Sequence, residues 1–107
     1  MSNFTKICAL SDLIADAGIP ALLGGKAIAL FYVNEQVYAL SNFDPIGQAN
    51  VMSRGIVGSI KGELVVASPL YKEHYSLSTG RCLENSEVAL TVYAVKVDGG
   101  DVWVENP

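Results

Sequence analysis

The sequence contains few cysteine and histidine residues, the usual ligands of zinc and iron–sulfur sites. Its 107 residues include two cysteines, Cys8 and Cys82, and one histidine, His74. A structural zinc site takes four Cys or His ligands, and a conventional iron–sulfur cluster takes four cysteines. The ligand count therefore excludes both, although a site completed by carboxylates or by a partner chain stays open.

Basic residues are scarce as well. Lys and Arg number seven against eleven Asp and Glu, which gives a formal net charge of −4. A nucleic-acid surface needs clustered Lys and Arg to neutralise phosphates. The acidic balance argues against nucleic-acid binding.

Long hydrophobic runs are missing too. The longest, Ala27 to Val33, is far short of the roughly 20 residues that a membrane-spanning helix requires. Lys6 is the only early base, and Asp12 and Asp16 interrupt the N-terminal apolar residues, so we expect no signal peptide. In a reducing compartment the two distant cysteines are expected to be free thiols, with a disulfide as the less favoured alternative. We predict a cytoplasmic protein.

What the sequence has in abundance is apolar residues, which make up 50% of it. This content and length suit one domain, residues 1–107, that builds its core without metals. Glycine turns separate short apolar segments, a pattern typical of β-strands. Strands are predicted over residues 5–10, 27–33, 36–40, 56–60, 63–67, 74–77, 81–83, 91–97 and 101–104, with one short helical turn or helix over 11–18. We expect an all-β, mainly antiparallel sandwich or barrel with one short helix.

Two segments do not fit this pattern of strands. Ser41–Arg54 and Ser68–Glu73 contain prolines and polar residues without regular apolar spacing, so both are predicted to be loops, the first long and irregular. Long loops in compact domains are commonly functional. Tyr71 lies in the second loop and is expected to be exposed, whereas His74 is interpreted as a strand-edge residue and Cys82 as a structural thiol.

The order of hairpins and loops resembles that of the Rieske ferredoxin domain. In that domain two loops each supply one Cys and one His to a [2Fe–2S] cluster, through C-x-H and C-x-x-H motifs. Here Asp44 and Ile46 stand at the first Cys and His positions, and Ser68 and Tyr71 stand at the second pair. The frame around them, including Gly47, is kept, but all four ligands are replaced.

Further motifs make the resemblance specific to one family of Rieske-like proteins. They are Ser41-Asn42-x-Asp44-Pro45, Ser53-Arg54-Gly55 and the segment from Gly62 to Leu70. Together they are similar to the small-subunit family of bacterial assimilatory NAD(P)H-dependent nitrite reductases, Rieske-like proteins without the cluster. The resemblance extends over essentially the whole chain.

This resemblance implies an accessory role. The family's large subunit carries FAD, siroheme and a [4Fe–4S] cluster and reduces nitrite to ammonium, and such chemistry belongs to the cofactors. No cofactor, metal or catalytic residue is expected on this chain. The expected docking surface on the large subunit consists of Pro45, Arg54, Pro69, Tyr71 and Lys72, because stiff loops with exposed Tyr and Arg suit protein interfaces.

Two alternatives remain at this stage. One is a redox carrier of the Rieske ferredoxin kind, which would need the four cluster ligands. The other is a stand-alone Rieske-like β-domain that acts as a binding or interaction module.

Overall fold

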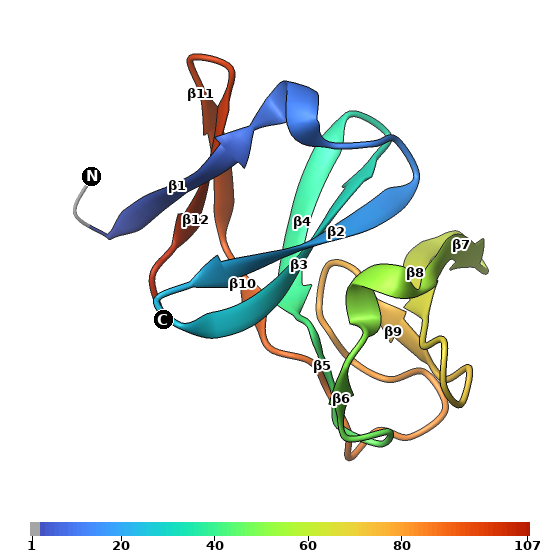
Figure 1. The fold of residues 1–107 in the computed structure, drawn as a ribbon. Helices are drawn as coiled ribbons and strands as arrows, with labels where there is room; N and C mark the ends of the chain where they lie inside the picture. The colour runs from blue at the N-terminus through green and yellow to red at the C-terminus, as the bar shows by residue number, and fades with distance from the viewer. Residues whose placement is uncertain (1–2) are drawn as a thin grey trace.

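Residues 3–107 are described by the computed structural model, in which β-strands dominate (Figure 1). Two 3₁₀ turns accompany the strands. In chain order the elements are β1 (Phe4–Ala9), η1 (Leu10–Asp12), β2 (Ala17–Leu23), β3 (Lys26–Val33), β4 (Gln36–Ser41), β5 (Phe43–Asp44), β6 (Ala49–Asn50), η2 (Met52–Arg54), β7 (Ile56–Ile60), β8 (Glu63–Ala67), β9 (His74–Ser76), β10 (Val92–Tyr93), β11 (Val95–Asp98) and β12 (Asp101–Glu105).

The strands form four antiparallel sheets. Their orders are β1-β12-β11, β10-β4-β3-β2, β5-β6 and β7-β8-β9. The predicted all-β, mainly antiparallel class is confirmed. The predicted turns between consecutive strands are confirmed as well, because residues with positive φ lie at Gly24-Gly25, Asn34-Glu35, Lys61-Gly62 and Gly99-Gly100.

Strand β3 explains how the layers stack. Its apolar run is continuous because both of its faces are buried. Ile28 and Leu30 pack into one core with Val102 and Val104 of β12. The alternate residues Ala29, Phe31 and Val33 pack into a second core with Met52, Val66, Tyr75 and Leu77. The β10-β4-β3-β2 sheet therefore lies between the β1-β12-β11 sheet on one side and η2 with the β7-β8-β9 sheet on the other.

The predicted short helical turn or helix over residues 11–18 is present, but it is shorter than expected and begins one residue earlier. Only Leu10–Asp12 is helical, as a single 3₁₀ turn, and Gly18 lies inside strand β2. Gly18 is not a helix cap, because its role is close packing: a Cβ there would lie 2.6 Å from Phe31 Cε1 and 2.7 Å from the Ser53 carbonyl oxygen. Such an approach between distant residues leaves no local signal in the sequence.

The C-terminal third of the chain also differs from the prediction. The expected single strand over 91–97 is two strands, because β10 pairs with β4 whereas β11 pairs with β12. The chain thus crosses from one sheet to the next at Ala94. The expected strand over 81–83 forms only isolated bridges, from Cys82 to Tyr75 and from Arg81 to Ala89. Within residues 3–107, no helix is long and apolar enough to cross a membrane.

Candidate functional site

The first predicted loop is ordered rather than irregular. Strands β5 and β6 form a small hairpin in which Asp44 pairs with Ala49. Residues 45–48 connect them, and Gln48 at their end has φ 62°. The Gln48 backbone N–H donates to the Asp44 carbonyl oxygen at 2.7 Å and closes the turn. The sequence prediction missed this hairpin because two-residue strands are too short to show alternation.

The second loop repeats this geometry between β8 and β9. The Ser68 N–H donates to the Glu73 carbonyl oxygen at 2.9 Å, and the Lys72 N–H donates to the Ser68 carbonyl oxygen at 3.1 Å. Lys72 has φ 66°, as Gln48 has 62°. The two segments also share a pattern, Asp44-Pro-Ile and Ser68-Pro-Leu. We call residues 44–48 and 68–72 the two tip loops.

Each tip loop is closed by the side chain of its first residue. Asp44 Oδ1 accepts hydrogen bonds from the backbone N–H groups of Ile46 at 2.9 Å and Gly47 at 3.0 Å. Ser68 Oγ accepts from the Leu70 N–H at 3.2 Å. Asp and Ser favour such turns because their short side chains reach the backbone two residues onward. Proline in the next position fixes φ and stiffens both tips.

A hydrogen bond between side chains joins the two tip loops. The Ser68 hydroxyl donates to Asp44 Oδ2, across 24 positions of sequence, and both side chains are buried. Burial alone raises the pKa of the Asp44 carboxyl, but the hydrogen bonds from Ser68, Gly47 and Ile46 outweigh it and hold that pKa below its ordinary value. The carboxylate is therefore ionised at neutral pH and is matched by three donors.

The tip loops also touch through Gly47. A Cβ at this position would lie 2.4 Å from Leu70 Cδ1 and 3.1 Å from Asp44 Oδ2. Glycine is required here because Leu70 of the other loop occupies the space of a side chain. The two tips thus form one packed unit held by a polar and an apolar contact.

Beneath this unit lies Tyr75, whose side chain is fully buried. Its hydroxyl oxygen has no hydrogen-bond partner among the described residues. Burial, followed by the nearby charges of Asp44, Cys82 and two glutamates, raises the pKa of the Tyr75 hydroxyl. The phenol is therefore neutral and has no proton-transfer partner here.

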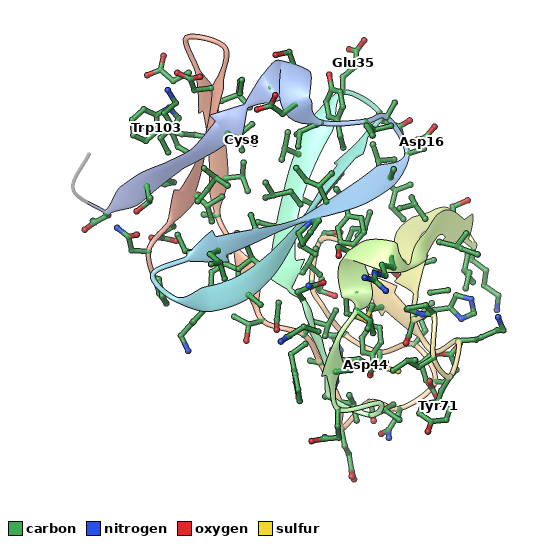
Figure 2. The ribbon with its side chains drawn as sticks, in the orientation of Figure 1. Cys8, Asp16, Glu35, Asp44, Tyr71 and Trp103 are labelled. Atoms are coloured by element: carbon green, nitrogen blue, oxygen red, sulfur yellow. The ribbon has the colours of Figure 1, made fainter. Side chains whose placement is uncertain are left out.

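The outer surface of the tips is apolar. Tyr71 is 64% exposed and Leu70 is 45% exposed. Pro69 and Lys72 are exposed beside them, and Pro45 is half-buried. Figure 2 shows Asp44 and Tyr71 at the end of the molecule opposite Cys8 and Trp103. The structure thus gathers four of the five predicted docking residues on the tip loops.

Arg54 lies outside the two tip loops. It ends η2, which packs against β2 and β3 and leads into β7. The preceding Ser53 is held by Asn42, which lies between β4 and β5, because the Ser53 backbone N–H donates to Asn42 Oδ1 at 2.7 Å. Arg54 itself is exposed.

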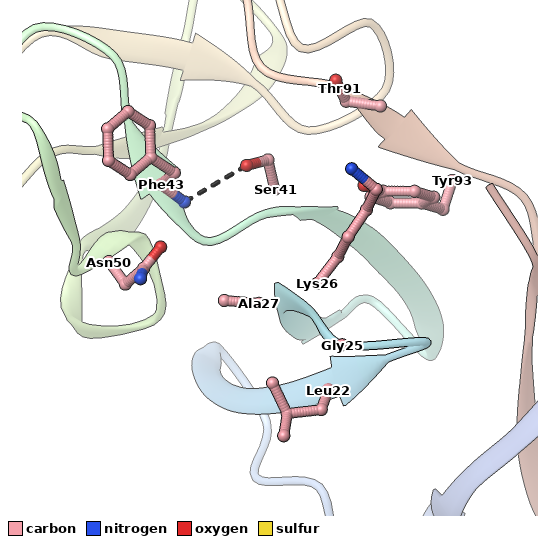
Figure 3. Close-up of a pocket in the computed structure, with 9 residues that line it drawn as sticks. All are labelled: Leu22, Gly25, Lys26, Ala27, Ser41, Phe43, Asn50, Thr91 and Tyr93. Atoms are coloured by element: carbon pink, nitrogen blue, oxygen red, sulfur yellow. Dashed lines mark hydrogen bonds between the residues drawn. The ribbon is translucent and has the colours of Figure 1, made fainter.

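A groove of about 420 Å³ borders the first tip loop. Its lining includes Lys26 beside Leu22, Phe43 and Tyr93, with no acidic residue among the nine that surround it (Figure 3). Leu22 and Phe43 are exposed apolar residues. Phe43 of β5 thus adds one exposed apolar side chain next to the first tip loop.

Comparison with known proteins identifies the family. Residues 3–105 match the family described as the Rieske-like [2Fe-2S] domain. The chain belongs to this family. It is 41% identical over 108 residues to a nitrite reductase (NADH) small subunit of Salmonella typhimurium, covering 99% of this chain and 100% of that one. An NMR structure of the E. coli protein NirD superposes with a TM-score of 0.88 at 37% identity, over 96% of each chain.

A third relative is much longer. A nitrite reductase NAD(P)H large subunit of Klebsiella oxytoca is 48% identical over 100 residues, which are 94% of this chain but 10% of that protein. A domain similar to this chain is thus part of a long polypeptide in that organism.

The family implies a [2Fe–2S] cluster, and the residues of this Rieske-like chain do not fit one. The side chains at the two cysteine positions, Asp44 and Ser68, hydrogen-bond directly to each other. Ile46, at one histidine position, has no ligand atom. Within the described part of the chain no three His, Cys, Asp or Glu side chains gather as a metal-binding group. This Rieske-like domain closes its tips with a hydrogen bond at the positions of the two cluster cysteines.

The two cysteines and the histidine lie outside the tip loops. Cys8 and Cys82 are not joined, as expected, and Cys82 is buried in the core. His74 begins strand β9, which confirms the strand-edge interpretation. Its Nδ1 lies 2.6 Å from Glu84 Oε2, and its backbone N–H donates to Glu84 Oε1 at 2.9 Å. Burial raises the pKa of the Glu84 carboxyl, but the hydrogen bonds from His74 and the charge of His74 together outweigh it and hold that pKa below its ordinary value.

The sequence prediction placed Phe43, Gly47 and Leu70 within the two loops and kept Gly47 in the Rieske-like frame, but it named none of them as a docking residue. One signal could have found Leu70 and Gly47. The repeated pattern of Asp or Ser, Pro and a branched apolar residue predicts two equivalent turns. Nothing local indicates the exposure of Phe43.

Proposed function

We propose that this chain is the small, cluster-less accessory subunit of an NAD(P)H-dependent nitrite reductase. Full-length identity of 41% to a nitrite reductase small subunit is the observation that carries this proposal. The large subunit holds FAD, siroheme and a [4Fe–4S] cluster and reduces nitrite to ammonium. This chain, a single domain over 1–107 in the cytoplasm, contributes no cofactor.

The chemistry of the tips supports an accessory role. Electron transfer through this fold needs a cluster between the tip loops, and Asp44, Ile46, Ser68 and Tyr71 do not provide the required thiolates and imidazoles. Because a proline stiffens each loop and the Asp44–Ser68 bond joins them, the tips lose little conformational entropy on binding. We therefore assign the tip loops to docking.

The docking surface has the character of an interface core. Tyr71 and Leu70 expose apolar side chains next to each other in the chain, and Tyr is a residue type that dominates binding energy. Lys72 and Arg54 are exposed charges that would lie at the rim. The fused Klebsiella relative supports the same association, because a similar domain is covalently part of a protein named as a large subunit.

Binding to the purified holo large subunit tests this proposal. The wild-type chain is expected to bind, and Tyr71→Ala is expected to weaken binding about tenfold or more because it removes an interface anchor. Arg54→Ala should weaken it less. Val97→Ala, which removes another exposed apolar side chain, from β11, is the matched control. Unchanged binding by both Tyr71→Ala and Arg54→Ala would exclude these two residues from the interface, and no binding by the wild type would exclude the subunit role.

A further inference from the structure

Strand β7 has a free edge in the described structure. It is the outer strand of the β7-β8-β9 sheet and pairs only with β8. The Lys61-Gly62 turn makes Ile60 and Glu63 a hydrogen-bonded pair. Because hydrogen-bonded and non-hydrogen-bonded pairs alternate along antiparallel strands, Gly58 bonds to β8, whereas Val57 and Ser59 direct their N–H and C=O groups outward.

The longer edges of the other sheets carry features that block strand addition, whereas the residues of β7 carry neither a charge nor a proline nor a bulge. Natural proteins protect edges with charges, proline, bulges or covering segments. The β7 sequence is Ile56-Val57-Gly58-Ser59-Ile60, uncharged and in regular register, with Ile56 74% exposed. By contrast, the longer edges are protected by Pro20 in β2, by Lys6 and a register shift in β1, by Lys96 and Asp98 in β11, and by the Cys82 bridge beside β9.

A hollow of about 420 Å³ lies beside β7. Val57, Gly58 and Ser59 line one side, and Asp16 and Asn34 are among the residues that complete it. Asp16 is the one charged residue in the lining, and its carboxylate has no ion pair or hydrogen bond among the described residues. The hollow thus places one negative charge, without a partner among the described residues, next to β7.

We propose that an extended segment of the nitrite reductase large subunit adds to β7 as a fourth strand and directs a basic side chain to Asp16. This inference rests on the proposed function. Main-chain bonds to Val57 and Ser59 would supply affinity, as in other strand-addition complexes. A second copy of this chain fits less well, because its own β7 has no basic residue to place beside Asp16.

Proline at position 59 tests the strand addition. The Ser59 N–H faces outward, so Ser59→Pro removes no hydrogen bond within the sheet, and proline is tolerated on such edges. The Ser59→Pro substitution leaves one carbonyl oxygen of the added strand without a hydrogen-bond donor. We therefore expect about tenfold weaker binding to the holo large subunit. Ser59→Thr, which keeps the N–H, should bind like the wild type. Asp16→Asn should weaken binding about twofold to fivefold at low salt. Wild-type affinity in a folded Ser59→Pro chain overturns the proposal.

Amide hydrogen exchange on the wild-type chain gives an independent test. The Val57 and Ser59 amides should exchange fast in the free chain and slowly in the complex. If the complex forms and protects only other amides, the strand addition is wrong and the subunit role stands. If no complex forms, both fail. If the free chain is a dimer in which these two amides are already protected, the occupant is a second copy and the assignment to the large subunit is wrong.

Discussion

The bond between Asp44 and Ser68 can be removed by one substitution, Ser68→Ala. Both side chains are buried, and Asp44 accepts two further bonds, from the backbone N–H groups of Ile46 and Gly47. Alanine removes the Ser68 hydroxyl and leaves Asp44 Oδ2 facing a methyl group. Water cannot replace the donor without opening the contact between the tips.

The structure indicates the size of the effect. A hydrogen bond to an ionised group contributes about 1.5–3 kcal/mol, and a buried acceptor left without its donor loses a similar amount. We therefore expect Ser68→Ala to lower the free energy of unfolding by about 2 kcal/mol at pH 7. Ser78→Ala removes an exposed serine hydroxyl from a turn and should change it by less than about 0.5 kcal/mol.

The effect should depend on pH in a defined direction. The folded-state pKa of Asp44 is lower than its ordinary value of 3.8. Ionisation of Asp44 therefore stabilises the wild type above about pH 4, and this contribution is lost as the pH falls through the folded pKa. Without the Ser68 donor the pKa of Asp44 rises, so stability should begin to fall at a higher pH in Ser68→Ala. The difference between the two proteins should shrink below pH 4.

Urea denaturation of both proteins from pH 3 to pH 8 measures these differences. A double-mutant cycle with Asp44→Ala isolates the pair, and we expect a coupling of about 1.5–3 kcal/mol at pH 7. A coupling near zero, or a loss of stability in Ser68→Ala that does not change with pH, would refute the assignment of the Asp44–Ser68 bond as the link between the tips.

Three further experiments test the packing. Gly80→Ala should lower the free energy of unfolding, measured by thermal denaturation, by more than about 3 kcal/mol, because the new Cβ would lie 2.1 Å from a carbonyl oxygen and φ is 78°. Gly99→Ala, where φ is 62° and the space around the Cβ is open, should lower it by only about 1 kcal/mol. Tyr75→Phe should leave the free energy of unfolding unchanged or raise it, because the Tyr75 hydroxyl has no hydrogen-bond partner among the described residues. A decrease in the free energy of unfolding of more than about 1 kcal/mol would contradict this expectation. Gly47→Ala should destabilise by about 1–3 kcal/mol and be partly rescued by Leu70→Ala, which removes the clashing methyl.

Much of the sheet structure could be predicted because its signals are local. The strands over 56–60 and 63–67 were predicted with their observed bounds, since a tight glycine turn joins two apolar segments. The apolar run over 27–33 was predicted as a strand, and it is apolar throughout because β3 is buried on both faces. The strand over 91–97 was predicted as continuous because alternation does not reveal which sheet each half joins.

The candidate site was less predictable, since its geometry depends on contacts between distant residues. The sequence placed Asp44 and Ser68 in separate loops, but no local pattern indicates that their side chains meet. Gly18 was interpreted as a helix cap for the same reason, because the Phe31 ring and the Ser53 carbonyl that require it are distant in sequence. The free edge of β7 becomes visible only when the sheet order is known.

A map of backbone amide protection over the whole chain, free and bound to the holo large subunit, tests the central claim most directly. The account predicts that the amides of Ile46, Gly47, Leu70 and Tyr71 become more protected on binding, in a chain that contains no iron. Protection confined to the opposite end, around Cys8 and Trp103, with the tip amides unchanged, would contradict it.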